Sequence, residues 1–254
     1  MSKIILITGA TSGFGKAIAT LFAKKGYNVI INGRRKERLA ELEHKLKAEY
    51  HVDVLSLPFD VRKRDEVKQA IDNLPDEWKN IDVLVNNAGL ASGLSEIQDG
   101  NLDDWDVMID TNVKGLLYMT RAVTPLMIKN QSGHIINIGS VAGKEVYPRG
   151  NVYCATKHAV DALNKAMRID LLPHKIKVTA INPGLAETEF SVVRYHGDTV
   201  KAAQVYKGFT PLNANDIAEA AWFAASRPSH VNINDMIIVP AAQATSRDVV
   251  RESI

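Results

Sequence analysis

Cysteine is almost absent from this sequence of 254 residues, and so are long hydrophobic runs. The single Cys154 excludes an internal disulfide and a cysteine-rich metal site. No apolar stretch approaches the roughly 20 residues that cross a membrane. The histidines lack the spacing of metal ligands. We therefore expect no metal, no membrane association and a cytoplasmic protein.

An excess of charge of one sign is also lacking. Lysine and arginine number 31 against 29 acidic residues, so the formal net charge is only +2. The basic residues alternate with acidic ones, as in RRKERLAELEHKLKAE, and form no stripe with aromatic residues. Proteins that bind nucleic acids concentrate basic residues on one face. We therefore expect no nucleic-acid partner.

What the sequence does contain is a regular alternation of short apolar runs with longer helical patterns. The apolar runs are the predicted strands, at 3–8, 28–32, 52–57, 82–87, 134–139, 177–182 and 236–240. The helical patterns lie near 14–26, 35–50, 63–74, 103–130, 151–172 and 214–226. Continuously apolar strands are typical of a parallel sheet with helices on both faces. We predict an α/β protein with a doubly wound parallel sheet, of the Rossmann type, as one domain over residues 1–254.

The predicted helix 103–130 carries more apolar residues than one buried stripe requires. They cluster at 107–109 and at 116–119. Such a helix is expected to be covered on two sides, one of them the sheet. A partner subunit or a lid segment of the same chain would cover the other side, and the sequence leaves both open.

A glycine-rich turn, ITGATSGFGKAIA, follows the first predicted strand and begins the first helix. Gly9, Gly13 and Gly15 leave room for a pyrophosphate to approach the backbone, and the helix N-terminus supplies free N–H donors. The spacing G-x-x-x-G-x-G differs from the commoner G-x-G-x-x-G. The strand-turn-helix context is nevertheless the one that a dinucleotide site needs.

The end of the second predicted strand distinguishes between the two nicotinamide dinucleotides. NAD sites place an acidic residue there for the ribose 2′-hydroxyl. This chain has Gly33-Arg34-Arg35 instead. A carboxylate would repel a 2′-phosphate, whereas a guanidinium binds it through paired hydrogen bonds. The sequence therefore predicts NADP rather than NAD.

The stretch VYCATKHAV places Tyr153 and Lys157 on one face of a predicted helix. A free phenol, with a pKa of about 10, is a poor base at neutral pH. An ammonium about 4 Å away would lower that pKa by up to about three units in a covered site. The spacing alone also fits an ordinary amphipathic helix.

Six motifs in order resemble the short-chain dehydrogenase/reductase family over nearly the whole chain. They are TGATSGFG, NNAG at 86–89, TNVKG at 111–115, INIGS at 136–140, YCATK at 153–157 and NPG at 182–184. Within that family the chain is most similar to the NADP-dependent 3-hydroxy acid dehydrogenases, which include serine and L-allo-threonine dehydrogenases. This closer similarity rests on NGRR, NIDVLVNNAG, MIDTNVKGL, GNVYCATK and PGLAETEFSVVRYHGD.

The resemblance implies roles for particular residues. Tyr153 would transfer the proton, and Lys157 would activate it and hold the nicotinamide ribose. Ser140 would bind the substrate oxygen, and Asn112 would link Lys157 to solvent through a water or a backbone group. Gly139 departs from the pattern, because the family often has serine there. The implied cofactor-binding residues are Gly9, Thr11, Ser12, Gly13, Phe14, Gly15, Arg34, Arg35, Asp60, Val61, Asn87, Ala88, Gly89, Tyr153, Lys157, Pro183, Gly184 and Thr188.

A long segment, 185–212, follows the sixth predicted strand and is expected to cover the substrate. Arg194 within it, or Arg149 before Tyr153, would clamp a substrate carboxylate through two hydrogen bonds. A surface or interface salt bridge explains either arginine equally well.

These observations predict an NADP-dependent enzyme. It would transfer hydride between the cofactor and the 3-hydroxyl of a small 3-hydroxy acid such as serine, L-allo-threonine or 3-hydroxypropionate. The alternatives are a carbonyl reductase of broader specificity and a non-catalytic NADPH-binding module. The resemblance also implies a homotetramer.

Overall fold

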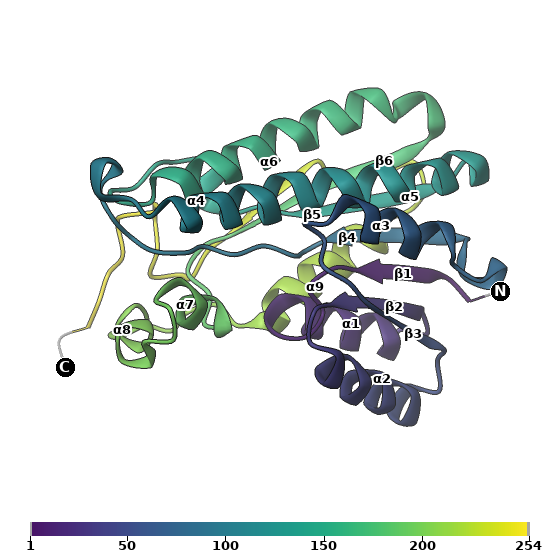
Figure 1. Cartoon of the computed structure of the whole chain (residues 1–254), viewed down its shortest axis with the longest axis horizontal. Helices are drawn as coiled ribbons and strands as arrows, with labels where there is room; N and C mark the ends of the chain where they lie inside the picture. Colours follow the sequence, from purple (N-terminus) through teal and green to yellow (C-terminus); the bar gives the residue numbers. More distant parts are fainter. Residues whose placement is uncertain (1, 253–254) are drawn as a thin grey trace.

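The computed structural model describes residues 2–252, and within them seven parallel strands form one sheet (Figure 1). The strands are β1 (Ile4–Ile7), β2 (Asn28–Gly33), β3 (Val54–Pro58), β4 (Ile81–Asn86), β5 (Gly133–Ile138), β6 (Ile176–Pro183) and β7 (Asp235–Ile238). Their order across the sheet is β3-β2-β1-β4-β5-β6-β7. The order reverses between β1 and β4, and ligands bind at such a switch point, beyond the carboxyl ends of the strands. The predicted doubly wound parallel sheet is confirmed.

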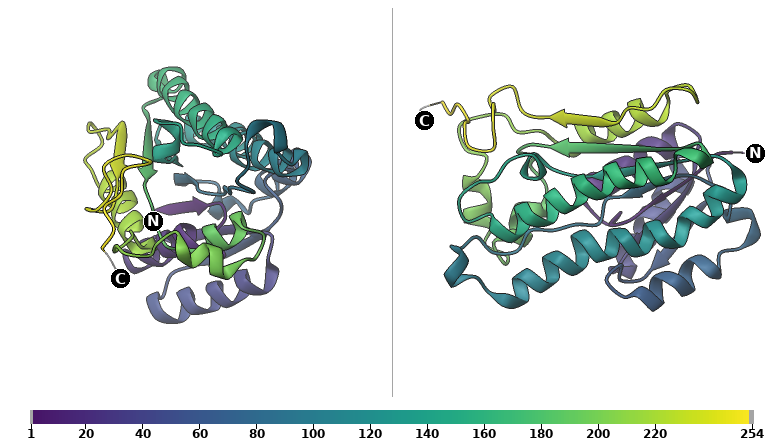
Figure 2. Two further views of the ribbon diagram at one scale, coloured as in Figure 1. Left: turned by 90° about the vertical axis from the view of Figure 1, so that its left-hand side faces the viewer. Right: turned by 90° about the horizontal axis from the view of Figure 1, so that it is seen from above.

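Helices cover both faces of the sheet (Figure 2). They are α1 (Gly13–Lys24), α2 (Lys36–Tyr50), α3 (Arg64–Asp72), α4 (Leu102–Ile109), α5 (Leu116–Asn130), α6 (Asn151–Asp170), α7 (Glu189–Arg194), α8 (Thr199–Gln204) and α9 (Ala214–Ala225). Residues of α1, α2 and α9 form the apolar core on one face, and residues of α3, α5 and α6 form the core on the other. The strand boundaries agree with the sequence prediction to within two residues.

Strand β1 shows why the strands are continuously apolar. Ile5 and Ile7 are buried against α1 and α9, whereas Ile4 and Leu6 are buried on the opposite face. Successive strand residues point to opposite faces, so a strand covered on both sides needs apolar residues at every position. The sequence pattern therefore reports two-sided burial.

One predicted helix differs in the structure. The segment 103–130 is not a single regular helix, because a π-helical turn, Asp110–Gly115, separates α4 from α5. In this segment Met108 and Leu116 are buried, whereas Ile109 and Leu117 remain partly exposed. The structure therefore covers one side of this segment, and what lies against the other stays a prediction.

The segment 185–212 lies at the carboxyl ends of the strands, as predicted, and contains the short helices α7 and α8 (Figure 1). The chain then enters α9, whose N-terminus has a capping box. The Asn213 side chain accepts from the start of the helix, and Asp216 accepts from the backbone of Asn213 at 2.7 Å. Among residues 2–252, no helix combines the length and apolarity that a membrane span requires.

Candidate active site

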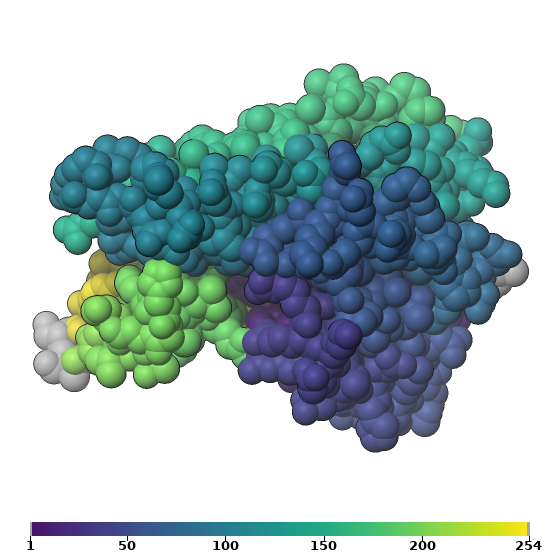
Figure 3. Space-filling model, viewed as in Figure 1, coloured from purple at the N-terminus to yellow at the C-terminus, as the bar shows by residue number. Residues whose placement is uncertain are grey.

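A cavity of about 300 Å³ lies beyond the carboxyl ends of the central strands. The glycine-rich turn after β1, the end of β2, the loop after β4 and the start of α7 form its walls. In the space-filling view the surface is hollowed between the glycine-rich turn and the segment that carries α7 and α8 (Figure 3). The cavity thus occupies the position predicted for the dinucleotide.

The glycine-rich turn has the backbone geometry that a phosphate cradle needs. Gly9 and Gly13 have φ angles of 67° and 51°, a region that L side chains rarely adopt. A Cβ on Gly9 would also lie 3.0 Å from the Cα of Ala88. Both glycines line the cavity, together with Thr11 and Ser12. The turn therefore fits a pyrophosphate.

Gly15 has a different role from the one predicted. It is not among the described residues that line the cavity. A Cβ at this position would lie 2.4 Å from the carbonyl oxygen of Gly9 and 2.5 Å from the amide nitrogen of Asn87. Gly15 thus lets α1 pack closely against the turn, and the amide of Asn87 holds the turn by donating to the carbonyls of Thr8 and Gly9.

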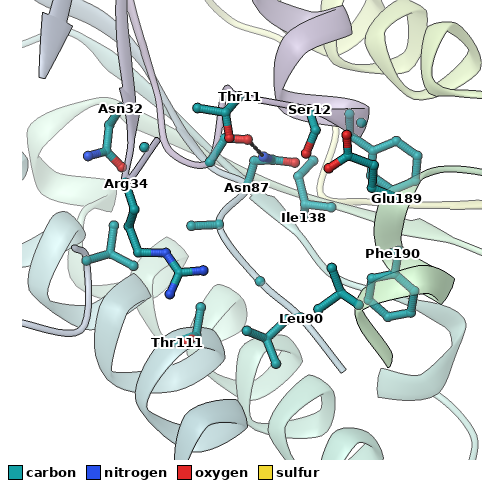
Figure 4. A pocket seen from close by; sticks show the side chains of 18 of the residues that line it. Thr11, Ser12, Asn32, Arg34, Asn87, Leu90, Thr111, Ile138, Glu189 and Phe190 are labelled. Atoms are coloured by element: carbon teal, nitrogen blue, oxygen red, sulfur yellow. Dashed lines mark hydrogen bonds between the residues drawn. The ribbon is translucent and has the colours of Figure 1, made fainter. Parts of the chain in front are cut away.

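The two predicted 2′-phosphate arginines occupy different places. Arg34 extends into the cavity from the end of β2 (Figure 4). Arg35 lies over the glycine-rich turn and donates to the hydroxyls of Thr11, at 2.8 and 3.1 Å, and Ser12, at 2.9 Å. Its remaining terminal nitrogen forms an ion pair with Glu189 of α7 at 3.0 Å. Both arginines line the cavity, but the guanidinium of Arg35 is engaged by the turn and by Glu189, whereas Arg34 extends into the space (Figure 4).

Asp60 and Val61, both implied cofactor-binding residues, line the same cavity. The carboxylate of Asp60 accepts hydrogen bonds from the Arg62 side chain at 2.9 and 3.0 Å. Burial works to raise the pKa of Asp60, but the hydrogen bonds from Arg62 and the nearby charge of Arg34 hold it below its ordinary value. Asp60 therefore stays ionised. Asn87, Ala88 and Gly89 complete this wall.

Tyr153 and Lys157 lie on one face of α6, as predicted, and both line the cavity. Lys157 Nζ is 5.9 Å from the centre of the Tyr153 ring and donates to the carbonyl of Ile138 at 2.9 Å. Burial lowers the pKa of Lys157 to about 8. The pair is thus held in a covered site.

The expected lowering of the tyrosine pKa by Lys157 is not what this geometry produces. Burial raises the pKa of Tyr153, and the neighbouring Tyr147 raises it further. A hydrogen bond with Ser140 and the charge of Arg194 act in the opposite direction but do not offset burial. The physical reason is that desolvation of the phenolate outweighs the attraction of an ammonium directed at a backbone carbonyl. With its pKa raised, Tyr153 is protonated at neutral pH.

Asn112 lies in the π-helical turn between α4 and α5. Its side chain accepts from the backbone N–H of Leu90 at 2.8 Å and donates to the Leu90 carbonyl at 2.8 Å. It also donates to the hydroxyl of Thr156 on α6 at 3.0 Å. Asn112 thus joins the loop after β4 to the helix that carries Tyr153 and Lys157. Its backbone partner is thus Leu90, and the predicted link from Lys157 to solvent stays a prediction.

Ser140 follows β5 and caps a short turn, accepting from the N–H of Ala142 at 3.1 Å. A second cavity, of about 190 Å³, adjoins the first and is lined by Ser140 and Tyr153 together. Three further predicted residues, Pro183, Gly184 and Thr188, line this cavity, and so does Phe14. It has the position expected for a substrate.

Of the two candidate arginines, the structure brings Arg194 to this second cavity. Arg149 lies instead at a small hollow of about 10 Å³, which Tyr153 and Arg194 also line, and it lines neither of the two cavities described above. Arg194 donates to the hydroxyl of Tyr147, and its guanidinium carbon lies 5.3 Å from the centre of the Tyr153 ring. Its Nε is buried and has no hydrogen-bond partner among residues 2–252.

Sequence reasoning missed three residues at these cavities. Glu189 pairs with both Arg35 and Arg38, the latter at 2.7 Å. Tyr147 holds Arg194, and Gln243 accepts from the backbone N–H of Leu185 at 2.8 Å beneath Gly184. Glu189 lies within the stretch PGLAETEFSVVRYHGD, but no signal in the sequence shows these three contacts, because the partners are distant along the chain. Within residues 2–252 there is also no group of three or more His, Cys, Asp or Glu side chains placed to hold a metal.

Comparison with known proteins gives the class to which this site belongs. The model of the short chain dehydrogenase family matches residues 3–197, and the chain belongs to that family. It is 49% identical over 242 residues to an NADP-dependent 3-hydroxy acid dehydrogenase of Salmonella typhi, covering 95% of this chain and 96% of that one. It is 46% identical to sulfoacetaldehyde reductase 2 of Chromohalobacter salexigens, covering 97% of each.

Among solved structures, the closed form of a serine dehydrogenase complexed with NADP⁺ superimposes with a TM-score of 0.91. Its sequence is 46% identical, with 98% of this chain and all of that one covered. The predictions of the family and of an oxidoreductase of the short-chain dehydrogenase class are confirmed. The expectation of NADP agrees with the cofactor in the names of these relatives.

Proposed function

We propose that this chain is an NADP-dependent dehydrogenase of small 3-hydroxy acids, with serine, L-allo-threonine and 3-hydroxypropionate as candidate substrates. The dinucleotide supplies or accepts the hydride. Gly9, Gly13, Thr11 and Ser12 would hold its pyrophosphate, and Arg34 would reach its 2′-phosphate.

The buried guanidinium of Arg194 carries this proposal. It lines the cavity that Ser140 and Tyr153 share, and its Nε has no partner among the described residues. A buried donor without a partner costs free energy unless a ligand satisfies it, and a guanidinium matches a carboxylate through two hydrogen bonds. An anionic group on the substrate therefore fits this wall of the cavity.

The names of the relatives support a substrate whose anionic group lies at a fixed spacing from the reacting carbon. The substrate of a 3-hydroxy acid dehydrogenase carries its carboxylate one carbon away from the reacting carbon. Sulfoacetaldehyde carries its sulfonate at the same spacing. A single guanidinium beside the reacting carbon would serve both, which makes the acid group, rather than the rest of the substrate, the recognised feature.

The roles of the side chains follow from their contacts. Ser140 would hydrogen-bond the substrate oxygen and fix it beside Tyr153. Tyr153 would accept the hydroxyl proton during oxidation and return it during reduction. Lys157, held by the Ile138 carbonyl, would keep a positive charge beneath the ribose. Asn112 would keep the loop after β4 in register with α6.

The decisive experiment is a substrate panel with an arginine variant. Arg194→Met is expected to raise KM for 3-hydroxypropionate by about tenfold or more, since a charge-assisted hydrogen bond contributes about 1.5–3 kcal/mol. KM for an uncharged alcohol of similar size would change little. Arg149→Met is the matched control, because Arg149 lines neither the cofactor cavity nor the cavity that Ser140 and Tyr153 share. Equal changes for both substrates would remove the anion-binding role.

A carbonyl reductase of broader specificity is the second candidate. The rings of Phe190, Tyr147 and Tyr195 also line the substrate cavity, and such a wall accepts uncharged ketones. Initial rates of NADPH oxidation with an uncharged diketone, compared with those for a 3-oxo acid, would separate the two candidates.

We also propose that the chain acts as a homotetramer in the cytoplasm. Support for a subunit contact comes from Leu102 and Ile109 of α4 and Leu117 of α5, apolar side chains that the fold leaves exposed or partly exposed. Light scattering coupled to gel filtration tests this proposal. A monomer that persists at micromolar concentration would contradict it.

A further inference from the structure

The loop that carries Ser140 is held at both ends. Ser140 begins the loop one residue after the end of β5, a short turn follows at Val141–Gly143, and Lys144 ends it. A serine that binds a reacting oxygen must be fixed in position, because small displacements of such a group are costly to the rate. What fixes this loop therefore bears on catalysis.

The first end of the loop is held from β6. The backbone N–H of Ser140 donates to the amide oxygen of Asn182 at 3.3 Å. The amide nitrogen of Asn182 donates in turn to Oδ1 of Asp235 and to the carbonyl of Met236, the latter at 3.3 Å, both on β7. Asn182 thus transmits the position of the edge strand β7 to Ser140.

Gly139 shows how tightly Asn182 fits. A Cβ at residue 139 would lie 2.1 Å from the amide oxygen of Asn182, a distance that real atoms do not reach. At residue 139, where the family often has serine, the Asn182 side chain leaves no room for a Cβ in this structure. The same side chain therefore fills the space beside Gly139 and contacts Ser140.

The second end of the loop is held by charge. Lys144 Nζ lies 2.5 Å from Oδ2 of Asp235 and 2.5 Å from Oδ1 of Asp161 on α6. Burial works to lower the pKa of Lys144, but the hydrogen bonds to Asp161 and Asp235 raise it above its ordinary value. The lysine side chain is only 21% exposed, so solvent screens this cluster less than a surface pair.

We propose that Asp235 is a positioning residue for Ser140, because its two carboxylate oxygens hold the two ends of the loop 140–144. Oδ1 acts through Asn182 on Ser140, and Oδ2 acts directly on Lys144. The proposal rests on the proposed function in one respect, the assignment of Ser140 to the substrate oxygen. It adds a residue of the edge strand that touches neither substrate nor cofactor.

A double-mutant cycle tests this relationship. Asp235→Ala is expected to lower kcat about tenfold in the wild-type background, as a misplaced catalytic group does, with KM for NADPH within twofold of wild type. In the Ser140→Ala background the same change should lower kcat by less than twofold, since no serine remains to be positioned. Asp161→Ala is the matched control, because it removes the other carboxylate partner of Lys144 and leaves Asp235 in contact with both loop ends.

The pH profile provides a readout that a general loss of stability would not move. The hydrogen bond from Ser140 lowers the pKa of Tyr153. A loosened Ser140 would raise the pKa of Tyr153 and, because Tyr153 must be deprotonated to accept a proton, would shift the acidic limb of the oxidation profile to higher pH in Asp235→Ala and not in Asp161→Ala. An unshifted profile in Asp235→Ala would overturn the proposal.

Asn182→Ala keeps the proposal testable if Asp235→Ala does not fold. It should reproduce the loss of kcat, and Gly139→Ala should cost nothing further in its presence, although Gly139→Ala alone would be damaging. The outcomes separate the two assignments. A Ser140→Ala variant with wild-type kcat would remove the proposed role of Ser140. A damaging Ser140→Ala with equal losses from Asp235→Ala in both backgrounds would overturn the positioning role alone.

Discussion

Lys157 donates from Nζ to the carbonyl oxygen of Ile138 at 2.9 Å, which ties the catalytic face of α6 to the last residue of β5. The contact points the ammonium at the backbone rather than at the phenol of Tyr153. With its pKa lowered to about 8 by burial, Lys157 keeps its charge at neutral pH and loses it above about pH 8. Lys157 therefore contributes a positive charge to the cavity at neutral pH, and it does not bring the pKa of Tyr153 down.

Tyr153→Phe is expected to abolish turnover while NADPH binding stays within a few-fold of wild type. The phenol hydroxyl is the proton-transfer group that lines both cavities, and general acid–base catalysis contributes about 10²–10⁴-fold. Single-turnover absorbance at the NADPH band and a fluorescence titration measure the two quantities. A variant that kept more than about a tenth of the wild-type rate would contradict the assignment.

Arg34→Ala is expected to weaken NADPH binding by roughly ten- to hundredfold and to leave NADH binding nearly unchanged. Arg34 reaches into the cavity, and charge-assisted hydrogen bonds to a 2′-phosphate contribute about 1.5–3 kcal/mol (Figure 4). Arg64→Ala is the control, since Arg64 pairs with Asp65 on the exposed side of α3 and is not among the described residues that line this cavity. Equal weakening of both dinucleotides would argue against a phosphate contact.

Glu189→Gln is expected to speed the release of NADPH by up to about fivefold. Glu189 on α7 bridges to Arg35 and Arg38 across the cleft, and partly exposed ion pairs contribute up to about 1 kcal/mol. Stopped-flow displacement measures the release rate. Glu41→Gln removes a carboxylate from the adjacent groove, and within residues 2–252 Glu41 forms no ion pair. Identical release rates in the two variants would exclude a clamp.

Acid is expected to destabilise the protein through His134. Burial lowers the pKa of this histidine from its ordinary 6.5 to about 3. Below about pH 6.5 this histidine is therefore protonated in the unfolded chain but stays neutral in the folded chain. The free energy of unfolding falls as the pH decreases from 6.5 toward 3. From pH 7 to pH 5 the loss in the free energy of unfolding is about 2 kcal/mol from this residue.

Chemical denaturation at the two pH values measures this loss. His134→Val should reduce the difference by about 2 kcal/mol, whatever its effect on absolute stability. His44→Gln, which removes an exposed histidine on α2, is the control and should leave the difference unchanged. An unaltered pH dependence in His134→Val would refute the prediction.

The sequence by itself determined the features that depend on neighbours along the chain. Strand β1 needs apolar residues at every position because both its faces are buried, and that requirement is visible in the letters. The glycine-rich turn and the spacing of Tyr153 and Lys157 are likewise local, since a turn and one helical face bring the groups together.

Tertiary structure decided everything that depends on distant partners. Arg35 pairs with the carboxylate of Glu189, which is 154 positions away in the sequence. The loop of Ser140 is held by Asp235, which lies on the edge strand β7. Only packing placed Arg194, rather than Arg149, at the substrate cavity. The pKa of Tyr153 followed its burial rather than its spacing from Lys157, because desolvation depends on all surrounding atoms, and no sequence interval records those.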